Sequence, residues 1–306
     1  MARRKSKKGK SSVLAIIIVA VILLAGSKLV PQSSWDSLFN KSGVTDKLSS
    51  QAGMAVHFVD VGQGDCVVVE SHGRYMLIDT GEADMGQRVL NYLNNLGVEK
   101  LDYCIATHPH SDHIGSMGKV LEDYPAEKLI MPELSEINIP TTSTFEKFLL
   151  SAEENCDEII AAEAGFTYSM GEVEIQILGP CDQDEDLNNM SVVAKVSYGD
   201  SSFLITGDCS FDEEDDIMDN YYNHLESDVL KVGHHGSSGS TSVDWLEAIE
   251  PEIAVISVGE GNSYGHPHDE IIELLEKNGV EILRTDIEGD IILCSDKTKV
   301  YRPTSN

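Results

Sequence analysis

The chain has 306 residues, of which 41% are hydrophobic and 24% charged, an ordinary composition for a folded protein of one or two domains. Its charge is unusual, because 22 Lys and Arg residues stand against 52 Asp and Glu residues, giving a formal net charge of −30. Such a surface repels polyanions at long range. We therefore expect no broad basic face and no stable nucleic-acid complex held by the surface.

The first 53 residues predict targeting rather than a folded domain. A basic tail in residues 1–12 precedes the apolar run 13–30, an order typical of a segment whose basic end stays in the cytoplasm. Ala25-Gly26-Ser27 resembles the cleavage site of a signal peptide, whereas Leu29 and Val30 lengthen the apolar run and favour an uncleaved signal anchor. Residues 31–53 are typical of a linker. The sequence thus predicts one domain, 54–306, tethered at the extracellular face of the membrane or secreted.

Short apolar runs separated by Gly and turn residues predict a mixed succession of strands and helices in this domain. The mixture predicts an α/β (α+β) class with two sheets. The expected strands are, in chain order, 55–61, 66–71, 75–78, 101–107, 128–131, 173–178, 191–198, 202–206, 228–232, 253–258, 280–284 and 290–294. The expected helices are 89–96, 115–123, 144–152, 211–224, 243–249 and 269–277.

Two further features of the chain carry little functional signal. The acidic run Asp212–Asp219 lacks the ligand spacing of an EF-hand loop, so we expect a solvated helix face there. The six cysteines form no C-x-x-C pair, so no cysteine zinc site is predicted.

The hexapeptide His108-Pro109-His110-Ser111-Asp112-His113 follows the predicted strand 101–107 and is the strongest functional signal. His108 and His110 alternate, so the end of an extended strand can direct both at one metal ion. Asp112 and His113 lie one turn further on and can face a second ion. Two ions held about 3.5–4 Å apart are a common device for hydrolysis. The pattern predicts a dinuclear metal-dependent hydrolase.

Two aspartates also follow predicted strands. Asp79 leaves a buried strand into the turn Thr80-Gly81, where its carboxylate can orient a neighbouring His, although Asp is also common in plain turns. Asp208 follows the strand 202–206, and its two carboxylate oxygens can bridge two divalent ions. Its alternative role is to cap the acidic helix that comes next.

Three further loops contain residues that we expect to contact a metal ion or the substrate. Adjacent residues cannot point the same way on a strand, so His234 and His235 predict one metal ligand and one substrate contact or proton donor. His266 lies in a Gly-rich loop that suits leaving-group contact, or else a simple turn. The turn at 62–65 lets backbone approach a ligand, although any tight hairpin needs such glycines. The expected substrate contacts are Gln63, Asp65, Asn189, Ser237 and His268.

Taken in order, these segments resemble the motifs of metallo-β-lactamase-fold hydrolases. Their residue sequences resemble one subgroup, the hydrolase domain of the ComEC-type DNA-uptake (competence) proteins. The resemblance covers Met54 to about Cys294. It implies a four-layer αββα sandwich with the site at one edge of two facing sheets. The segments that carry it are Val59–Asp65, Leu77–Gly81, Thr107–His113, Thr206–Asp208, Leu230–Ser237 and Tyr264–His268.

The resemblance also implies roles for individual residues. His108 and His110 would hold the first metal, and Asp208 would bridge to the second. One of His234 and His235, favouring His235, would complete the second site with Asp112 and His113. The expected catalytic residues are Asp112, Asp79 as the orienting acid, His234 and His266.

One departure concerns the first metal. The wider superfamily adds a third His between the His cluster and the bridging Asp, but no His lies between His113 and Asp208 here. The corresponding stretch, Leu187–Ser191, offers Asn and Ser instead. Harder oxygen ligands shift preference from Zn²⁺ towards Mn²⁺, so the expected cofactors are two divalent ions, Zn²⁺ or Mn²⁺.

These observations predict an exported phosphodiesterase or nuclease that acts on DNA or a related phosphodiester through a metal-bridging hydroxide. A second hypothesis keeps the chemistry and changes the substrate to a cell-wall polymer, such as the phosphocholine of teichoic acids. A third, motivated by the missing His, is a metal-poor binding module. β-Lactam hydrolysis is disfavoured, because the residues of the motifs resemble another subgroup of the superfamily.

Overall fold

The computed structural model describes residues 53–303. The predicted basic tail, the apolar segment and all but the last residue of the predicted linker lie outside the described residues. Within 53–303, no helix is both long enough and apolar enough to cross a membrane.

The first sheet combines the amino-terminal strands of the domain with its last two strands, in the order β15-β14-β1-β2-β3-β4-β5-β6. Strands from β15 to β3 pair antiparallel, and strands from β3 to β6 pair parallel. Runs such as Val67-Val68-Val69 are β-branched and fully buried, as a covered sheet requires. The strands are β1 (Met54–Phe58), β2 (Val67–Ser71), β3 (Arg74–Ile78), β4 (Leu101–Ile105), β5 (Ala126–Met131), β6 (Cys156–Ala161), β14 (Ile291–Ser295) and β15 (Val300–Tyr301).

The second sheet has the order β13-β12-β11-β10-β9-β8-β7. Strands β7 to β10 pair antiparallel, and β10 to β13 pair parallel. The strands are β7 (Thr167–Met170), β8 (Val173–Gly179), β9 (Val193–Tyr198), β10 (Ser201–Ile205), β11 (Val229–Lys231), β12 (Ile253–Ile256) and β13 (Glu281–Arg284).

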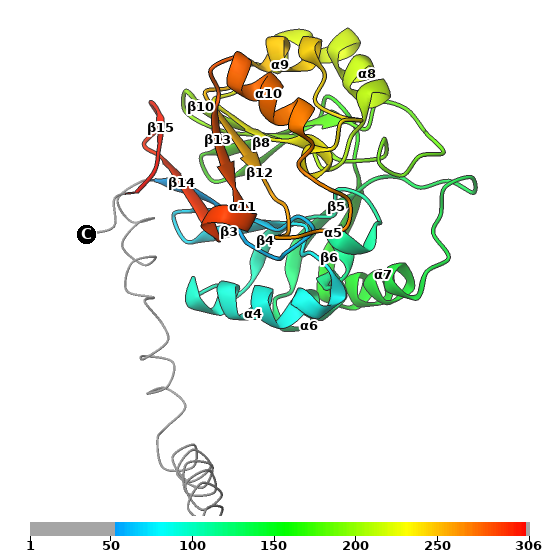
Figure 1. Ribbon diagram of the computed structural model, residues 1–306. Helices are drawn as coiled ribbons and strands as arrows, with labels where there is room; N and C mark the ends of the chain where they lie inside the picture. Colours follow the sequence, from blue (N-terminus) through cyan, green and yellow to red (C-terminus); the bar gives the residue numbers. More distant parts are fainter. Residues whose placement is uncertain (1–52, 304–306) are drawn as a thin grey trace, which may run out of the picture. The chain divides into compact units, whose positions relative to one another are not determined.

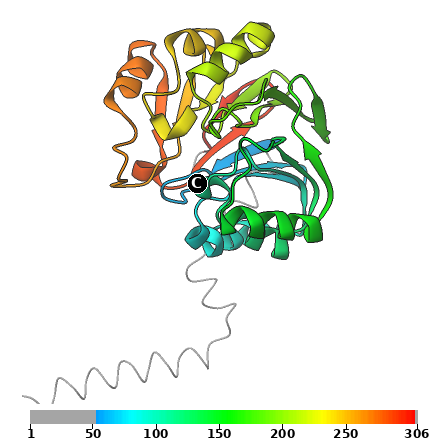
Figure 2. The same cartoon turned by 90° about the vertical axis from the view of Figure 1, so that its right-hand side faces the viewer.

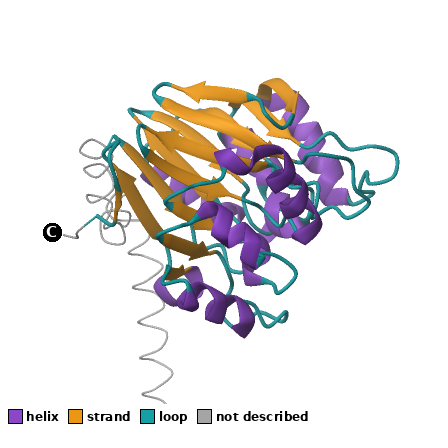
Figure 3. Ribbon diagram, turned by 90° about the horizontal axis from the view of Figure 1, so that it is seen from above, coloured by secondary structure: helices purple, strands orange, loops and turns teal. Residues whose placement is uncertain are grey.

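Parallel strands need crossover connections, and here helices supply most of them. Figures 1 and 2 show α4, α6 and α7 on the outer side of the first sheet, and α8, α9 and α10 on the outer side of the second. Figure 3 shows the strands running side by side with a twist. The helices are η1 (Ala83–Met85), α4 (Gly86–Asn95), α5 (Ser111–Ile114), α6 (Met117–Asp123), α7 (Ser143–Asn155), α8 (Phe211–Tyr221), η2 (Tyr222–His224), η3 (Gly233–Gly236), α9 (Val243–Ile249), α10 (Asp269–Lys277) and α11 (Thr285–Glu288).

The core lies in three layers of apolar side chains. The middle layer joins the inner faces of both sheets, where Phe58 and Ile105 of the first meet Ile175 and Phe203 of the second. The other two layers lie between each sheet and its own helices. Burying one such side chain fully contributes about 1.5–3 kcal/mol. The two facing sheets of the predicted class are confirmed, and with the outer helices they make the αββα arrangement.

The predicted element pattern missed three strands, β6, β7 and β15. β6 and β7 lie at the outer edges of the two sheets, and four of the six side chains of β6 are exposed. Edge strands often carry charged residues that discourage pairing with other chains. Asp157 and Glu158 of β6 are of this kind, so its sequence lacks an apolar pattern.

The carboxyl ends of the parallel strands place the polar motifs at one edge of the fold. Asp79 follows β3 and His108 follows its parallel neighbour β4. Asp208 follows β10, and His234 and His235 follow its parallel neighbour β11. Clefts in α/β folds form at such strand ends.

The acidic helix α8 corrects one expectation. Its acidic run was expected to be a solvated face, but Glu213 is 3% exposed and Glu214 is fully buried. Glu214 accepts hydrogen bonds from the backbone N–H groups of Thr241 and Ser242, and Glu213 Oε1 accepts one from the Cys181 N–H at 2.9 Å. Both carboxyls turn inward because these loop N–H groups need acceptors. Burial raises the pKa of Glu213 to about 8 and that of Glu214 to about 7.

The raised pKa of Glu213 predicts a pH-dependent effect of Glu213→Gln. In the wild type, folding stability falls as pH rises from about 4.5, the unfolded pKa, to about 8, because the native state holds its proton longer. Gln keeps the acceptor for Cys181 and cannot ionise. We expect the substitution to be nearly neutral at pH 4, below the unfolded pKa, and stabilising by about 1–3 kcal/mol at pH 9 in urea unfolding. Asp215→Asn, on the exposed face of α8, is the control, and an effect of Glu213→Gln that is equal at both pH values would contradict the prediction.

Candidate metal centre

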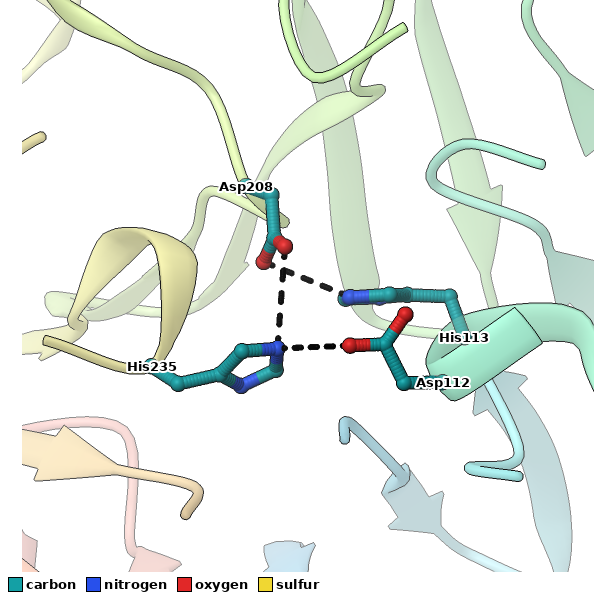
Figure 4. Close-up of side chains that lie close together, drawn as sticks. All are labelled: Asp112, His113, Asp208 and His235. Carbon is teal, nitrogen blue, oxygen red and sulfur yellow. Dashed lines mark ion pairs between the residues drawn. The ribbon is translucent and has the colours of Figure 1, made fainter. Parts of the chain in front are cut away.

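Four side chains from three parts of the chain converge where the strand ends meet. One possible ligand atom from each lies within 4.8 Å of the others. His113 Nε2 lies 3.3 Å from Asp208 Oδ1, and His235 Nε2 lies 3.4 Å from Asp112 Oδ2 (Figure 4). Asp112 and His113 come from α5, Asp208 from the loop after β10, and His235 from η3.

The unpartnered atoms of this cluster fit a divalent cation. His113 Nε2, Asp208 Oδ1 and His235 Nε2 are buried and have no hydrogen-bond partner. Buried polar atoms are rarely left so, and here all three face the same small space. A cation with imidazole and carboxylate ligands satisfies them, and that donor set suits zinc or manganese.

The charges of the cluster are mutually dependent. Burial disfavours every charged form, but the Asp208 carboxylate raises the pKa of His235 to about 9 and the pKa of His113 well above its usual range. Burial likewise opposes ionisation of Asp208, yet the imidazoles of His235 and His113 hold its pKa well below the usual range. The carboxylate therefore draws positive charge into the cluster. Protons and a metal ion compete for the same nitrogen atoms.

Asp79 holds His113 from behind. Its Oδ2 lies 2.7 Å from His113 Nδ1, and it also accepts hydrogen bonds from the Thr107 backbone N–H at 2.9 Å and the Thr107 hydroxyl at 2.6 Å. Burial raises the pKa of Asp79, while the His113 imidazole opposes the rise. Because Nδ1–H donates to this carboxylate, the lone pair of Nε2 is left for the cluster. The geometry suits the orienting role predicted for Asp79, which stays a prediction.

The two adjacent histidines of η3 point in different directions. Both have left-handed backbone, with φ of 49° for His234 and 55° for His235, which is uncommon for residues with a side chain. His235 is 1% exposed and its Nδ1 donates to the Ser257 carbonyl at 2.9 Å, leaving Nε2 for the cluster. The His234 ring faces the pocket, with Nε2 3.7 Å from Asp208 Oδ2. The geometry suits the expected division between a metal ligand and a substrate contact, which stays a prediction.

His108 and His110 lie close together, as their alternation predicted. Fewer possible metal ligands surround this pair than form the cluster described above. His108 Nε2 lies 3.0 Å from His110 Nδ1 and 3.9 Å from Asp208 Oδ2. Burial and the charge of His113 hold the pKa of His108 well below its usual range. Among the described residues, neither histidine joins a set of three or more converging His, Cys or acidic ligands. A first metal on this pair stays a prediction.

The stretch that replaces the third His contains one correction. Asn189, expected to contact substrate, is 3% exposed, and its Oδ1 accepts from the Ser210 backbone and hydroxyl. Asn188 lines the pocket instead, and its buried Oδ1 has no hydrogen-bond partner. Ser191 Oγ accepts from the Asp208 N–H at 3.0 Å and lies 3.4 Å from His108 Nδ1. The loop named from the sequence does reach the pocket, but the residue that lines it is Asn188, one position before the predicted Asn189.

The second correction concerns Asp65, which was also expected to contact substrate. It is 2% exposed, and its Oδ2 lies 2.8 Å from the ammonium of Lys231, which is fully buried. Its Oδ1 lies 3.4 Å from His235 Nδ1. Burial opposes ionisation, but Lys231 holds the pKa of Asp65 below its usual value. Lys231 was missed, although a lysine inside the apolar strand 228–232 already signalled a buried partner.

The cluster opens into a pocket of about 320 Å³ between the loops. His266 lines it with an unpartnered Nδ1, and burial together with neighbouring imidazoles lowers its pKa to about 4. Ser237 and His268 are not among the described residues that line it. They hold the loop after η3 instead, where His268 Nδ1 accepts from the Ser238 N–H at 2.8 Å. The pocket is lined by Gln63, His110, Ser111, Asp112, Asn188, Asp208, His234, His235, Tyr264 and His266.

The buried ion pair predicts a large effect of Lys231→Met. Removing the ammonium leaves the Asp65 carboxylate buried and unpaired, and we expect a loss of about 3–5 kcal/mol in the free energy of urea unfolding. Adding Asp65→Asn should recover part of the loss, because the two effects share one contact. Lys100→Met, which removes an exposed ion pair with Glu127, is the matched control. If the Lys231 and Lys100 variants lost the same free energy of unfolding, the buried pair would contribute no more to stability than the exposed pair.

Comparisons with known proteins agree with this geometry. Residues 59–169 match the family model described as the metallo-beta-lactamase superfamily. ComE operon protein 3 of Bacillus subtilis is 33% identical over 77% of this chain and 32% of its own length. Competence protein ComA of Neisseria gonorrhoeae is 32% identical over 77% of this chain and 31% of its own length. Recombination protein 2 of Haemophilus influenzae is 30% identical over 77% of this chain and 28% of its own length. The chain thus spans about a third of the length of these curated relatives.

Two solved structures share the fold. YhfI of Bacillus subtilis, a metallo-beta-lactamase fold protein, aligns with a TM-score of 0.52 and 13% identity over 78% of this chain and 98% of its own. CmlA of Streptomyces venezuelae, a diiron beta-hydroxylase, aligns with a TM-score of 0.54 and 14% identity over 82% of this chain and 54% of its own. The family match over residues 59–169 and the relatives above show that the chain carries a metallo-beta-lactamase superfamily domain, and its homologues include competence proteins.

Proposed function

We propose that this protein is a metal-dependent phosphodiesterase or nuclease that acts on DNA or a related phosphodiester. The observation that carries the proposal is the convergence of Asp112, His113, Asp208 and His235, three of whose facing atoms are buried without partners. That cluster opens into a pocket large enough for a small group. The resemblance to competence proteins favours DNA over other phosphodiesters.

The four residues named above would hold the second of two divalent ions, and His108, His110 and Asp208 the first. Bound divalent ions supply Lewis acidity and make water a nucleophile at neutral pH. Asp79 keeps the proton of His113 on Nδ1, at 2.7 Å from its own oxygen. Ser257 does the same for His235 through its carbonyl. Both contacts hold the ligand nitrogens in place before any ion binds.

Two imidazoles would exchange protons with the substrate under this proposal. The His234 and His266 rings lie 5.7 Å apart and both line the pocket. Burial lowers the pKa of each below its usual value, so both are neutral at pH 7. A phosphate between them would favour the charged form and raise their pKa values. Donation of a proton to a leaving group thus requires bound substrate.

The location of the protein follows from the same proposal. Residues 13–30 would tether the chain to the membrane, or be removed as a signal peptide, and the domain would then face outwards. A tethered enzyme outside the cell would meet both DNA and cell-wall phosphodiesters. Teichoic-acid phosphodiesters therefore remain the alternative substrate.

Metal content is the first test of the proposal. We expect the purified chain, stripped with a chelator and reloaded with Zn²⁺ or Mn²⁺, to bind at least one ion and up to two per chain. Asp208→Asn should lower the stoichiometry, because it removes a charge shared by the whole cluster. Asp215→Asn, an exposed acid, should not. Fewer than one ion per chain, with no restoration by either metal, would favour the binding module.

Substrate is the second test. Single- and double-stranded DNA, bis-p-nitrophenyl phosphate and teichoic-acid analogues are incubated with the chain under Mn²⁺. We expect cleavage of at least one DNA form, a loss of about 100-fold or more in Asp112→Ala and Asp208→Ala, and a loss of about 10–100-fold in Asp79→Asn. Activity on the teichoic-acid analogues alone would select the alternative. Undiminished cleavage by the Asp208 variant would place the active site elsewhere.

A further inference from the structure

Tyr264 stands at the rim of the pocket with most of its side chain in solvent. It is 65% exposed, yet it is also one of the residues that line the pocket. The other strongly exposed aromatic residues of the described part, Phe166, Phe211 and Tyr222, do not line it. Single exposed apolar residues are common and need no explanation, so the position of Tyr264 matters only if it is held in place.

The loop that carries Tyr264 is held by one side chain. Asn262 Oδ1 accepts hydrogen bonds from the backbone N–H groups of Tyr264 and His266, both at 3.1 Å. Asn262 Nδ2 donates to the carbonyls of Gly259, at 3.1 Å, and His266, at 2.6 Å. All four contacts close the loop on itself. The rim therefore has a defined shape before a ligand arrives, which lowers the cost of binding.

The Tyr264 ring is also oriented towards the chemistry. It stacks on the His266 ring, with centroids 5.6 Å apart and planes 21° apart. The loop is anchored across the pocket, because the Gly259 N–H donates to Gln63 Oε1 at 3.2 Å. A Cβ on Gly259 would lie 2.6 Å from the Gln63 backbone nitrogen, so only glycine permits this approach. Tyr264 thus sits beside an imidazole that faces the cluster.

The charge of the pocket requires uncharged contacts with the substrate. No Lys or Arg is among the described residues that line it, whereas Asp112 and Asp208 are. Apart from bound cations, the pocket gives a phosphodiester no fixed positive charge. Bound cations would hold the phosphate alone, and stacking of a base on an aromatic ring would add affinity without charge or sequence preference. A volume of about 320 Å³ is near the lower limit of ligand pockets and suits a nucleotide-sized group rather than a duplex.

We propose that Tyr264 is a stacking platform for the base next to the scissile phosphate, and that the preferred substrate is a single-stranded nucleic acid or short nucleotide. The inference rests on the proposed phosphodiesterase function and narrows its substrate class. It sets Tyr264 apart from the residues that hold metal or move protons. A polymer without aromatic rings, such as a teichoic acid, gains nothing from the platform.

The test compares two dinucleotides with the full-length chain under Mn²⁺. One is thymidylyl-thymidine, and the other carries tetrahydrofuran abasic residues in place of both bases. We expect the wild type to bind the first about 5- to 150-fold more tightly in calorimetry, and Tyr264→Ala to lose this preference while binding the abasic form unchanged. Tyr264→Phe should keep the preference. Tyr222→Ala, an exposed tyrosine outside the pocket, should behave as the wild type.

Several outcomes would overturn the platform. They are equal binding of the two dinucleotides by the wild type, no binding of either, or an equal loss for both in Tyr264→Ala, which would mean that the ring only supports the loop. Cleavage rates separate this inference from the phosphodiesterase proposal. Base-dependent binding through Tyr264 without cleavage would keep the platform and refute the hydrolase. Cleavage of both dinucleotides with equal kcat/KM would do the reverse.

Discussion

Lys231 is fully buried at the end of β11, and its ammonium meets the Asp65 carboxylate 2.8 Å away. Lys231 belongs to the second sheet, whereas Asp65 lies in the loop between β1 and β2 of the first. The contact ties the two sheets together at the edge where the cluster forms. A buried ion pair seldom adds net stability over an apolar contact, but it tolerates no loss of either partner. Its value here is positional, because Asp65 also reaches three other parts of the site.

Those contacts show how one loop positions the candidate metal ligands. The Asp65 N–H donates to the Asp112 carbonyl at 3.2 Å, and the Asp65 carbonyl accepts from the Gly81 N–H at 2.8 Å. A Cβ on the preceding Gly64 would lie 2.2 Å from the Asp112 carbonyl oxygen, so α5 packs directly on this turn. Asp65 Oδ1 lies 3.4 Å from the ring of His235. Asp65, which the sequence offered as a substrate contact, instead supports two candidate metal ligands, Asp112 and His235.

This difference marks what could be predicted from sequence. Asp79 and His108 follow neighbouring parallel strands of the first sheet, and Asp208 and His235 follow neighbouring parallel strands of the second, so the gathering of each pair was predictable without coordinates. Asp65 and Lys231 are 166 residues apart in the chain, and no local pattern pairs them. The inward turn of Glu214 depends on two backbone N–H groups of a distant loop. Local propensity predicts where polar residues occur, whereas only tertiary packing decides which way they point.

A net charge of −30 is compatible with the proposed polyanionic substrate if the bound segment is short. At physiological salt, exposed charges are screened over about 8 Å, so the acidic surface acts mainly on long substrates that extend across it. A dinucleotide-sized segment would meet only the pocket, where the two proposed cations would outweigh Asp112 and Asp208. An aromatic rim then adds affinity that salt does not weaken, unlike the counterion release that holds DNA on basic surfaces. An acidic enzyme of this design would select chain ends and single strands, because a duplex presents its charges to the surface and keeps its bases away from Tyr264.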